Sequence, residues 1–522
     1  MTTKYPIPNI CCHPMPDWLH ARTRATPHKL AVLCDGRSVS YVELDRLADG
    51  LAAGLISRGV QPGERVATRL PNSIEYIALI HAVARVSAVL VPLNTRLTEQ
   101  EIGYQTGLTE PVLGIGDWGV GSGDWRLATG DWQPPTATLS ELTQSPSHPV
   151  LPSSLLPFLP SPHPQSIIFT SGTTGQPKGA VLTFDNHLWS ANASAYRIGI
   201  DVNDHWLSCL PLYHVGGLAV VFRSCLYGTA IVLHERFDVD AFNASLDADS
   251  VTLTSLVPTM LHRLLQSRKG GWPARLRLIL LGGAAATPEQ LAAAWEAGVP
   301  VAPTYGLTEA SSQVATALPA DAQRKPGTVG KPLLFAEVRI AGESEPDRQG
   351  GSLVGESEPD RQGGSLPPGE IGEVLVRGPQ VMTGYYRNPE ATARTIRDGW
   401  LHTGDLGYVD DEGDLFLVQR RSDLIVTGGE NVYPAEVEAV LRQHPAVAEA
   451  CVVGVPDAEW GQRVAAAVQL RPDAVVGESS LLAFCRERLA GYKVPRLLRF
   501  VEELPQTASG KIERRRVVEM LG

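Results

Sequence analysis

A glycine- and hydroxyl-rich segment carries the densest set of anion-binding groups in the sequence. It follows the strand-like stretch Ser166–Ile168 and reads FTSGTTGQPKG over residues 169–179. Glycines let a backbone turn tightly enough to point several N–H groups at one anion, and hydroxyls and a lysine add further donors here. The residues predicted to contact that anion are Thr170, Ser171, Gly172, Thr173, Thr174, Gly175 and Lys178. The spacing is not that of a Walker A loop, G-x-x-x-x-G-K-[ST], so we expect a polyphosphate site of another kind.

Seven shorter motifs follow along the chain in a fixed order. They are LPLYH (210–214), GGA (282–284), YGLTE (305–309), WLHTGD (400–405), RRSD (420–423), GGEN (428–431) and GK (510–511). With the first segment, this ordered set resembles the adenylate-forming superfamily, which includes acyl- and aryl-CoA synthetases, luciferases and the adenylation domains of peptide synthetases. The resemblance implies an AMP-forming acid–thiol ligase that uses ATP, Mg²⁺ and CoA. A carboxylic acid would first become an acyl-adenylate, with release of pyrophosphate, and would then pass to the CoA thiol.

The motif residues also suit the parts of a bound nucleotide on chemical grounds. Thr308 and Glu309 pair a hydroxyl with a hard carboxylate, which fits a phosphate oxygen and Mg²⁺ respectively. Tyr305 offers a flat face for adenine. Asp405 can accept hydrogen bonds from both ribose hydroxyls, and Arg420 can donate to the same sugar. The other residues assigned to the nucleotide are Gly282, Gly283, Ala284 and Gly306, of which the first two would let backbone come close to the ring.

The resemblance singles out Lys511 as the residue that drives adenylate formation. A fixed ammonium there would stabilise the negative charge that builds up on the transferring group and on the leaving pyrophosphate. Ser422 lies where the family has its hinge, although many members carry Asp or Lys at that position. Backbone rotation there would withdraw Lys511 and bring Gly428 and Gly429 towards the thiol.

Three stretches resemble one branch of the superfamily, the o-succinylbenzoate–CoA ligases of menaquinone biosynthesis. They are LPLYHVGGL (210–218), SSQ (311–313) and RRSDLIVTGGENVYP (420–434). Within the first stretch, His214 lies where the superfamily often has an aromatic or histidine gate beside the acyl pocket, so we assign it both a catalytic and a substrate-contacting role.

The acid of that branch keeps a second carboxylate that does not react. Arg223 interrupts an apolar run, and a buried arginine requires an anionic partner, so it could bind this group. A purely structural Arg223 fits the sequence equally well. Ser311, Ser312 and Gln313 would supply neutral hydrogen bonds around the acid.

Three alternatives stay open. The first is a CoA ligase for another aryl or medium-chain carboxylic acid, and the second is an adenylation enzyme that serves a carrier protein. The third, from a different class, is a non-catalytic nucleotide-binding relative. The joint presence of Lys178, Glu309, Asp405 and Lys511 argues against this last alternative.

The elements that must position these residues follow an α/β pattern in the N-terminal part. Ser40–Glu43 and Thr98–Glu101 have the form of helix capping boxes, and Thr287-Pro288 opens another helix with proline at its first position. The stretch Gly63–Ala67 has a strand-like pattern between two such helices. This alternation favours a layered α/β architecture.

A compact α+β unit is expected after a break near Arg420. Strands are predicted at 425–427, 450–455 and 465–470, and helices at 434–444 and 479–489. We therefore predict a mixed α/β and α+β fold with a large, multi-subdomain AMP- and acyl-binding domain over residues 1–420. A small mobile domain over residues 421–522 would carry Lys511.

A tandem copy lies between the YGLTE and WLHTGD motifs of the N-terminal part. Residues 341–353 read AGESEPDRQGGSL and residues 354–366 read VGESEPDRQGGSL. This composition cannot bury much apolar area, and loop closure costs little more as a loop lengthens. We predict a solvated insertion in a β-hairpin loop and assign it no role.

Composition limits the partners and the compartment. Asp and Glu number 56 against 45 Lys and Arg, a formal charge of −11, which argues against nonspecific nucleic-acid binding. The seven cysteines show no metal-ligand spacing, and no signal peptide or membrane-spanning run is present. We predict a cytoplasmic enzyme with a small carboxylic acid as its partner, no nucleic acid and no membrane insertion. The oligomeric state stays open, a homodimer included.

Overall fold

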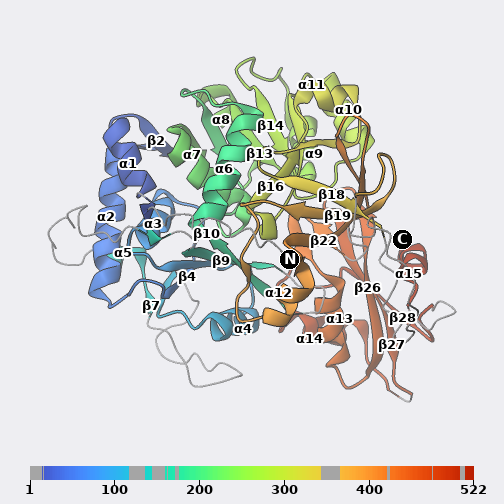
Figure 1. The fold of residues 1–522 in the computed structure, drawn as a ribbon. Helices are drawn as coiled ribbons and strands as arrows, with labels where there is room; N and C mark the ends of the chain where they lie inside the picture. Colours follow the sequence, from blue (N-terminus) through green and yellow to red (C-terminus); the bar gives the residue numbers. More distant parts are fainter. Residues whose placement is uncertain are drawn as a thin grey trace, which may run out of the picture.

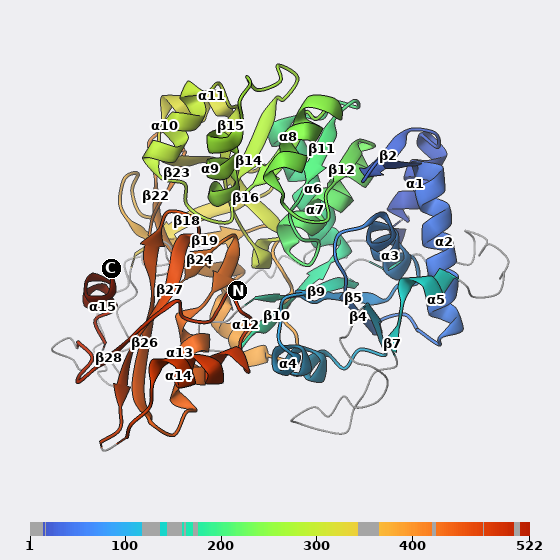
Figure 2. The same ribbon diagram turned by 180° about the vertical axis from the view of Figure 1, so that it is seen from behind.

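The computed structural model describes residues 14–15, 17–116, 136–143, 159–160, 163–170, 176–342, 365–419, 424–472, 474–505 and 512–522. A large N-terminal domain lies beside a smaller C-terminal domain, which is the orange-red part at the lower right of Figure 1 and is seen from behind in Figure 2. The predicted mixed α/β architecture with two domains of unequal size is confirmed. Several residues predicted for the site lie outside the described residues, namely Ser171–Gly175, Arg420, Ser422 and Lys511.

One sheet of the N-terminal domain holds the predicted polyphosphate segment. Its seven described strands, in spatial order, are β20 (Gly384–Tyr385), β10 (Lys178–Thr183), β9 (Pro164–Thr170), β5 (Val89–Pro92), β4 (Arg65–Arg69), β6 (Leu113–Gly116) and β7 (Thr136–Ala137). Strands β9 and β10 are antiparallel, with Thr170 opposite Lys178. The segment therefore connects two neighbouring strands, and the two strand ends bring its first and last predicted ligands together.

A second, longer sheet carries most of the other motifs. Its fourteen described strands include one side path, β21 (Ile396–Arg397) on β22. The others, in spatial order, are β18 (Glu337–Ala341), β19 (Gly372–Arg377), β22 (Trp400–Val409), β23 (Leu415–Gln419), β17 (Thr328–Pro332), β16 (Ser312–Thr316), β15 (Val301–Leu307), β14 (Leu278–Leu281), β13 (Leu253–Leu256), β11 (His205–Ser208), β12 (Ala230–Leu233), β2 (Leu30–Cys34) and β3 (Arg37–Ser40). Strands β13 and β14 are parallel and buried throughout, as expected for strands covered on both faces.

Helices fill the space between the two sheets and cover their outer faces. Helix α3 (Ile74–Arg85) contacts β5 of one sheet and β2 of the other, and α6 (Phe184–Ile198) contacts β10 and β16. Helix α3 begins at Ser73, whose hydroxyl accepts a hydrogen bond from the Tyr76 N–H at 3.0 Å. It is apolar on nearly every side, because it is buried between layers.

The remaining elements of the N-terminal domain are shorter or lie outside this central layer. They are α1 (Trp18–Ala25), α2 (Tyr41–Ser57), α4 (Glu99–Thr109), α5 (Leu139–Thr143), α7 (Val215–Tyr227), α8 (Val239–Ala248), α9 (Pro258–Ser267), α10 (Pro288–Glu296), the 3₁₀ turn η1 (Thr308–Ala310), α11 (Pro319–Arg324), α12 (Pro389–Thr395) and the strand pair β1 (Pro14–Met15) and β8 (Leu159–Pro160). Helix α4 covers the outer face of the seven-stranded sheet, where Ile102 packs with Val89 and Val91.

The C-terminal domain is a five-stranded sheet with three helices in its described part. Its strands are β25 (Glu430–Val432), β24 (Ile425–Thr427), β27 (Gly461–Leu470), β26 (Val447–Asp457) and, on β27, β28 (Leu497–Val501). Its helices are α13 (Pro434–Arg442), α14 (Glu478–Arg486) and α15 (Arg514–Leu521). The domain has its own core, in which Val437 and Leu441 of α13 pack on Val452 of β26.

Most sequence-based expectations for single elements are confirmed. Capping boxes are present at Ser40, Thr98 and Thr287. The helix predicted at 434–444 ends at Arg442, and the one predicted at 479–489 spans Glu478–Arg486; such ends are the least certain part of a sequence-based prediction. The tandem copy falls between β18 and β19, an antiparallel pair, but residues 343–364 lie outside the described residues.

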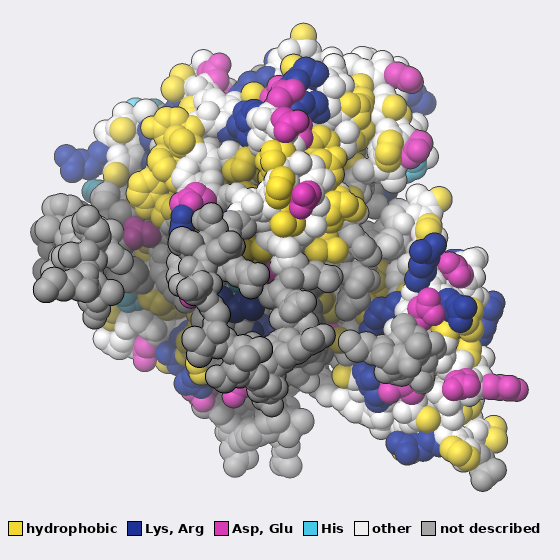
Figure 3. Space-filling view, turned by 45° about the vertical axis from the view of Figure 1, so that its right-hand side comes forward, with side chains coloured by type: hydrophobic (Ala, Val, Ile, Leu, Met, Phe, Trp, Pro, Cys, Tyr) yellow, Lys and Arg dark blue, Asp and Glu magenta, His cyan; other side chains and the backbone are white. Residues whose placement is uncertain are grey.

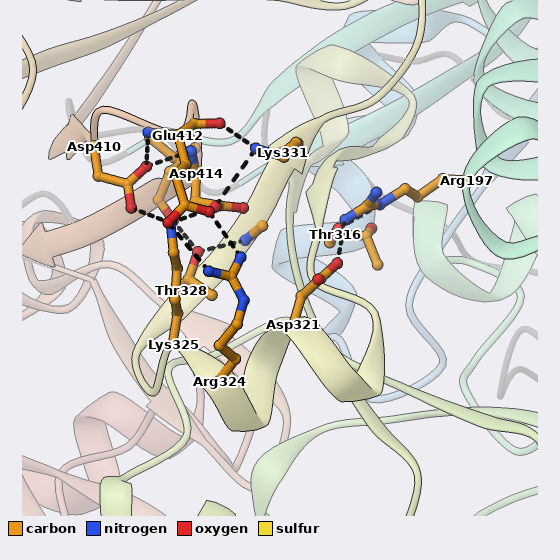
Figure 4. A network of polar contacts seen from close by, with 12 residues as sticks. Arg197, Thr316, Asp321, Arg324, Lys325, Thr328, Lys331, Asp410, Glu412 and Asp414 are labelled. Atoms are coloured by element: carbon orange, nitrogen blue, oxygen red, sulfur yellow. Dashed lines mark hydrogen bonds and ion pairs between the residues drawn. The ribbon is translucent and has the colours of Figure 1, made fainter.

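Ion pairs fasten the hairpin β22–β23 to the end of α11. Lys325 Nζ lies 2.5 Å from Asp410 Oδ2 and 2.8 Å from Asp414 Oδ2, and Asp414 is almost fully buried (Figure 4). On the face drawn in Figure 3, Lys and Arg side chains are interspersed with Asp and Glu side chains. Within the described part of the chain, no helix has the length and apolar character needed to cross a bilayer.

Candidate active site

A cavity of about 1060 Å³ is lined by residues of both domains. Most of the described residues that the sequence assigned to the site lie in its wall. They are Thr170, Lys178, His214, Arg223, Gly282, Gly283, Gly306, Thr308, Glu309, Ser312, Gln313, Asp405, Gly428 and Gly429. The motifs that are far apart in the sequence therefore converge on one space.

Glu309 is held in place from two directions. Tyr385 of β20 donates its hydroxyl to Glu309 Oε1 at 2.8 Å, and the Thr170 hydroxyl lies 3.4 Å from the same oxygen. Burial and the neighbouring Glu309 charge raise the pKa of Tyr385 well above its usual value, so the phenol stays a donor. The Lys178 ammonium lies 5.3 Å from the centre of the Tyr385 ring. Tyr385 thus links the predicted metal ligand to the predicted phosphate-binding lysine.

This carboxylate fits the role of a Mg²⁺ ligand. Mg²⁺ is usually held by one or two carboxylates together with substrate phosphates, not by an all-protein cage. In the described ranges, no group of three or more His, Cys, Asp and Glu side chains could hold a metal by itself. A single carboxylate beside the hydroxyls of Thr170 and Thr308 is compatible with a metal that arrives with nucleotide phosphates.

Close backbone packing shapes the wall beside Glu309. A Cβ on Gly306 would lie 1.8 Å from the Ser312 carbonyl oxygen, so only glycine fits there. Ser311 and Ser312 both have positive φ, at 53° and 99°, which is uncommon for residues other than glycine. Together these two features fold the chain back tightly after the 3₁₀ turn that carries Thr308 and Glu309.

Asp405 lies in the cavity wall, whereas Tyr305 does not. The Tyr305 hydroxyl donates to Asp405 Oδ2 at 2.6 Å, and its side chain is buried. The Tyr305 side chain belongs to the hydrophobic core, and its predicted stacking on adenine stays a prediction. Its observed contact orients the carboxylate predicted to bind ribose.

His214 contacts a carboxylate of the other domain. Its Nε2 lies 3.1 Å from Glu430 Oε2, and Glu430 is also within 3.3 Å of Asn94 Nδ2 and of an Arg96 guanidinium nitrogen. Burial by itself raises the pKa of Glu430. The hydrogen bond and charge of His214 and the charge of Arg96 more than offset this, so the pKa of Glu430 lies below its usual value. Glu430 follows the two cavity-lining glycines of β24–β25 directly.

Arg223 is the least satisfied polar side chain of the wall. It is 2 % exposed, and its Nε and Nη2 atoms have no hydrogen-bond partner among the described residues. Its guanidinium carbon lies 6.0 Å from the Trp206 ring centre. Burial lowers the pKa of Arg223. Burial of the neighbouring His187, together with the Arg223 charge, lowers the pKa of that histidine to about 3. The described residues thus offer this buried positive charge no carboxylate partner.

Two of the other predicted contacts lie away from the cavity. Ser311 donates its hydroxyl to the Gln380 carbonyl at 2.8 Å and does not line the wall, so its contact with the acid stays a prediction. Ala284 does not line the wall either. Gln313 does, but its Oε1 accepts from Ser194 at 2.8 Å and its Nε2 donates to Thr316 at 2.8 Å.

Two contacts of the site were not foreseen from the sequence. Tyr385 had no signal beyond its place after Gly384, because only the fold brings β20 beside Glu309. Glu430 belongs to the recognised GGEN motif, but its contact with His214 depends on how the domains meet. The available signal was the position of Glu430 directly after Gly428 and Gly429, the two glycines predicted to lie beside the thiol.

Comparison with known proteins agrees with this geometry. The AMP-binding enzyme family matches residues 19–386, and the AMP-binding enzyme C-terminal domain matches residues 436–511. The chain belongs to the AMP-binding enzyme family, and the prediction of an adenylate-forming enzyme is confirmed. A particular member stands close to it: the 2-succinylbenzoate–CoA ligase of Bacillus cereus is 41 % identical over 97 % of this chain and 98 % of that protein.

Solved structures of o-succinylbenzoate CoA synthetase from Bacillus subtilis show the same fold. A double mutant of that enzyme, bound with its product analogue OSB-NCoA, matches at TM-score 0.86 and 36 % identity, over 97 % of this chain and 99 % of that chain. The complex with the acyl-adenylate intermediate OSB-AMP matches at TM-score 0.69 and 36 % identity, over 96 % and 98 % of the chains. A complex of the same enzyme with ATP and magnesium ion matches at TM-score 0.68 and 36 % identity, over 96 % and 99 % of the chains.

Proposed function

We propose that this chain is an ATP-dependent o-succinylbenzoate–CoA ligase of menaquinone biosynthesis. The observation that carries the choice of acid is Arg223, a buried guanidinium with unpartnered nitrogens in the wall of the cavity that also holds the nucleotide motifs. An acid with a second carboxylate would satisfy this charge, whereas a fatty acid or benzoate would leave it unpaired. The similarity to 2-succinylbenzoate–CoA ligases supports the same acid.

In the first half-reaction, a carboxylate oxygen of the acid attacks the α-phosphorus of ATP and pyrophosphate leaves. We assign the phosphates to Thr170, Lys178 and the intervening loop, and the ribose to Asp405 and Arg420. Glu309 would hold Mg²⁺, which neutralises phosphate charge when it is bound. Lys511 would stabilise the charge that develops on the transferring group.

In the second half-reaction, the CoA sulfur attacks the acyl carbon and AMP leaves. We assign the thiol path to the wall formed by Gly428 and Gly429, with His214 as the gate beside the acyl group. A Cβ on Gly428 would lie 2.6 Å from the Trp460 ring, so a side chain there would displace either that ring or the backbone of the cavity wall. Both half-reactions use one cavity, and Ser422 is proposed as the hinge between them.

Two further features belong to this proposal. We place the domain boundary at residues 420 and 421, which agrees with the separate cores on either side. We propose that the enzyme acts in the cytoplasm, where its substrates ATP and CoA are found. Light scattering of the purified protein would distinguish a monomer from the homodimer that the sequence leaves open.

A panel of acids tests the substrate. The pyrophosphate release rate is measured with ATP, Mg²⁺ and CoA for o-succinylbenzoate, benzoate, a phenylalkanoate and octanoate. We expect o-succinylbenzoate to have the highest kcat/KM. A clearly higher value for benzoate or octanoate would refute the proposed acid and would favour a ligase for another aryl or medium-chain acid.

A further inference from the structure

A buried ion-pair cluster joins the two domains, and its lysine, Lys493, also lines the cavity. Lys493 Nζ lies 2.6 Å from Glu101 Oε1 and 2.7 Å from Glu436 Oε1. Glu101 belongs to α4 of the N-terminal domain, whereas Lys493 and Glu436 belong to the C-terminal domain. All three side chains are less than 10 % exposed. One lysine therefore pairs with one carboxylate inside its own domain and with a second across the interface.

The Glu101 carboxylate is ordered by contacts within the N-terminal domain alone. Glu101 Oε2 accepts from the Thr98 backbone N–H at 2.8 Å and from the Thr98 hydroxyl at 2.8 Å, which caps α4. The other oxygen is left pointing at Lys493. A receptor that is already ordered loses little conformational entropy when its partner docks.

Contacts around the ion-pair cluster also join the two domains. Ala490 packs with Val89 and Val91 of β5, and the Tyr492 ring lies under the Arg96 guanidinium, with 4.9 Å between the guanidinium carbon and the ring centre. The segment 490–493 therefore docks on the outer face of the seven-stranded sheet. This docking occurs at the same interface at which Glu430 meets His214 in the cavity.

The Lys493 charge pairs with Glu101 only when the C-terminal domain is docked. Burial by itself lowers the pKa of Lys493, but the two carboxylates more than offset this and raise it, so the lysine stays charged. Burial and the nearby Glu101 raise the pKa of Glu436, and its Oε2 has no hydrogen-bond partner among the described residues. If the C-terminal domain moves away, Lys493 keeps Glu436 and loses only Glu101.

We propose that Lys493 is a positioning residue for thioester formation: its ion pair with Glu101 holds the C-terminal domain where Gly428, Gly429 and Glu430 line the cavity. The inference rests on the proposed two-step function. The fold matches the Bacillus subtilis enzyme bound with its product analogue OSB-NCoA at TM-score 0.86, and the same enzyme with OSB-AMP at TM-score 0.69. The arrangement described here is therefore more similar to the first of these two structures. Loss of the pair should slow the second half-reaction and spare the first.

Two isosteric variants of the same cluster test the proposal. Glu101→Gln removes the charge that pairs across the interface, while Lys493 keeps Glu436 and the C-terminal domain keeps its own ion pair. Glu436→Gln removes the charge inside the C-terminal domain and keeps the pair between the domains. Each half-reaction is measured separately, as acyl-adenylate formed without CoA and as thioester formed from supplied acyl-adenylate and CoA.

We expect Glu101→Gln to slow thioester formation about tenfold, within the range of typical coupling energies, and to leave adenylate formation within about twofold of wild type. Glu436→Gln should change neither rate by more than about twofold. Lys325→Met breaks an ion-pair cluster that lies wholly in the N-terminal domain (Figure 4) and should not change the ratio of the two rates.

An equal loss of both half-reactions in Glu101→Gln, or no loss of either, would overturn the proposal. So would the same change of ratio in Glu436→Gln. The assay uses o-succinylbenzoate, or benzoate should the acid panel favour it. The result for the ion pair therefore does not depend on which acid is the substrate, and unfolding temperatures of all variants verify that each is folded.

Discussion

At the scale of single residues, Arg223 and Glu309 line one cavity, and we propose that they mark its acid end and its phosphate end. Arg223 brings a buried positive charge whose Nε and Nη2 have no hydrogen-bond partner among the described residues, and Glu309 brings a carboxylate fixed by two hydroxyls. Buried charges are costly unless they are paired, so each side chain favours a ligand of defined charge. Arg223 therefore favours an anionic group of the acid, whereas Glu309 favours the metal ion that accompanies the nucleotide phosphates.

Replacing Arg223 with methionine should weaken binding of the dicarboxylate and spare acids that lack a second carboxylate. A hydrogen-bonded charge pair contributes up to about 3 kcal/mol, so kcat/KM for o-succinylbenzoate should fall roughly a hundredfold. Benzoate serves as the control, because its single carboxylate is the reacting one. Equal losses for both acids would mean that Arg223 acts only in packing.

Tyr385→Phe should weaken the hold on Mg²⁺. Without the hydroxyl at 2.8 Å, Glu309 loses its best-ordered partner, and the Mg²⁺ concentration for half-maximal adenylate formation should rise about tenfold. Tyr386→Phe at the neighbouring position is the matched control. An unchanged Mg²⁺ requirement in Tyr385→Phe would show that the hydroxyl does not orient Glu309.

At the scale of elements, the layered packing of α3 and α6 also fixes how stability responds to acid. His81 of α3 and His187 of α6 are buried near the Phe222 ring. Burial lowers the pKa of His81 to about 4 and, with the charge of Arg223, that of His187 to about 3. Below the ordinary value of 6.5, the unfolded chain binds protons at these positions that the folded chain does not bind.

Stability should therefore be fully present above pH 6.5 and should decline as the pH falls towards 4. For His187, the loss between pH 7 and pH 5 is about 2 kcal/mol of the free energy of unfolding. His187→Gln should reduce the drop in urea midpoint between these pH values, while the exposed His28→Gln should not. A drop of the same size in His187→Gln would contradict this origin of the acid sensitivity.

The sequence was most informative at this scale where local rules operate. Capping residues set the starts of α2, α4 and α10, and strands were predicted correctly within β24, β26 and β27. Ser311 shows the limit, since its left-handed backbone turns the hydroxyl towards Gln380 instead of the cavity. No pattern in the sequence signals that turn, because it depends on the strand-to-strand packing around Gly306.

At the scale of the whole molecule, one cavity is completed by the docking of the C-terminal domain. The motifs predicted convergence on one nucleotide, and the fold brings Lys178, Glu309 and Asp405 into the same wall. The contacts between the domains could not be predicted, because Glu101 and Lys493 are 392 residues apart and neither belongs to a motif assigned to the nucleotide or the acid. The motifs indicate the chemistry, whereas the residues that hold the two domains together become visible only in the fold.

The most direct test of the account is the identity of the intermediate. The protein is incubated with o-succinylbenzoate, ATP and Mg²⁺ without CoA, and the products are analysed by mass spectrometry before and after CoA is added. The account predicts pyrophosphate and o-succinylbenzoyl-adenylate first, followed by AMP and the CoA thioester. Formation of ADP and phosphate, or of a thioester without any adenylate, would contradict it.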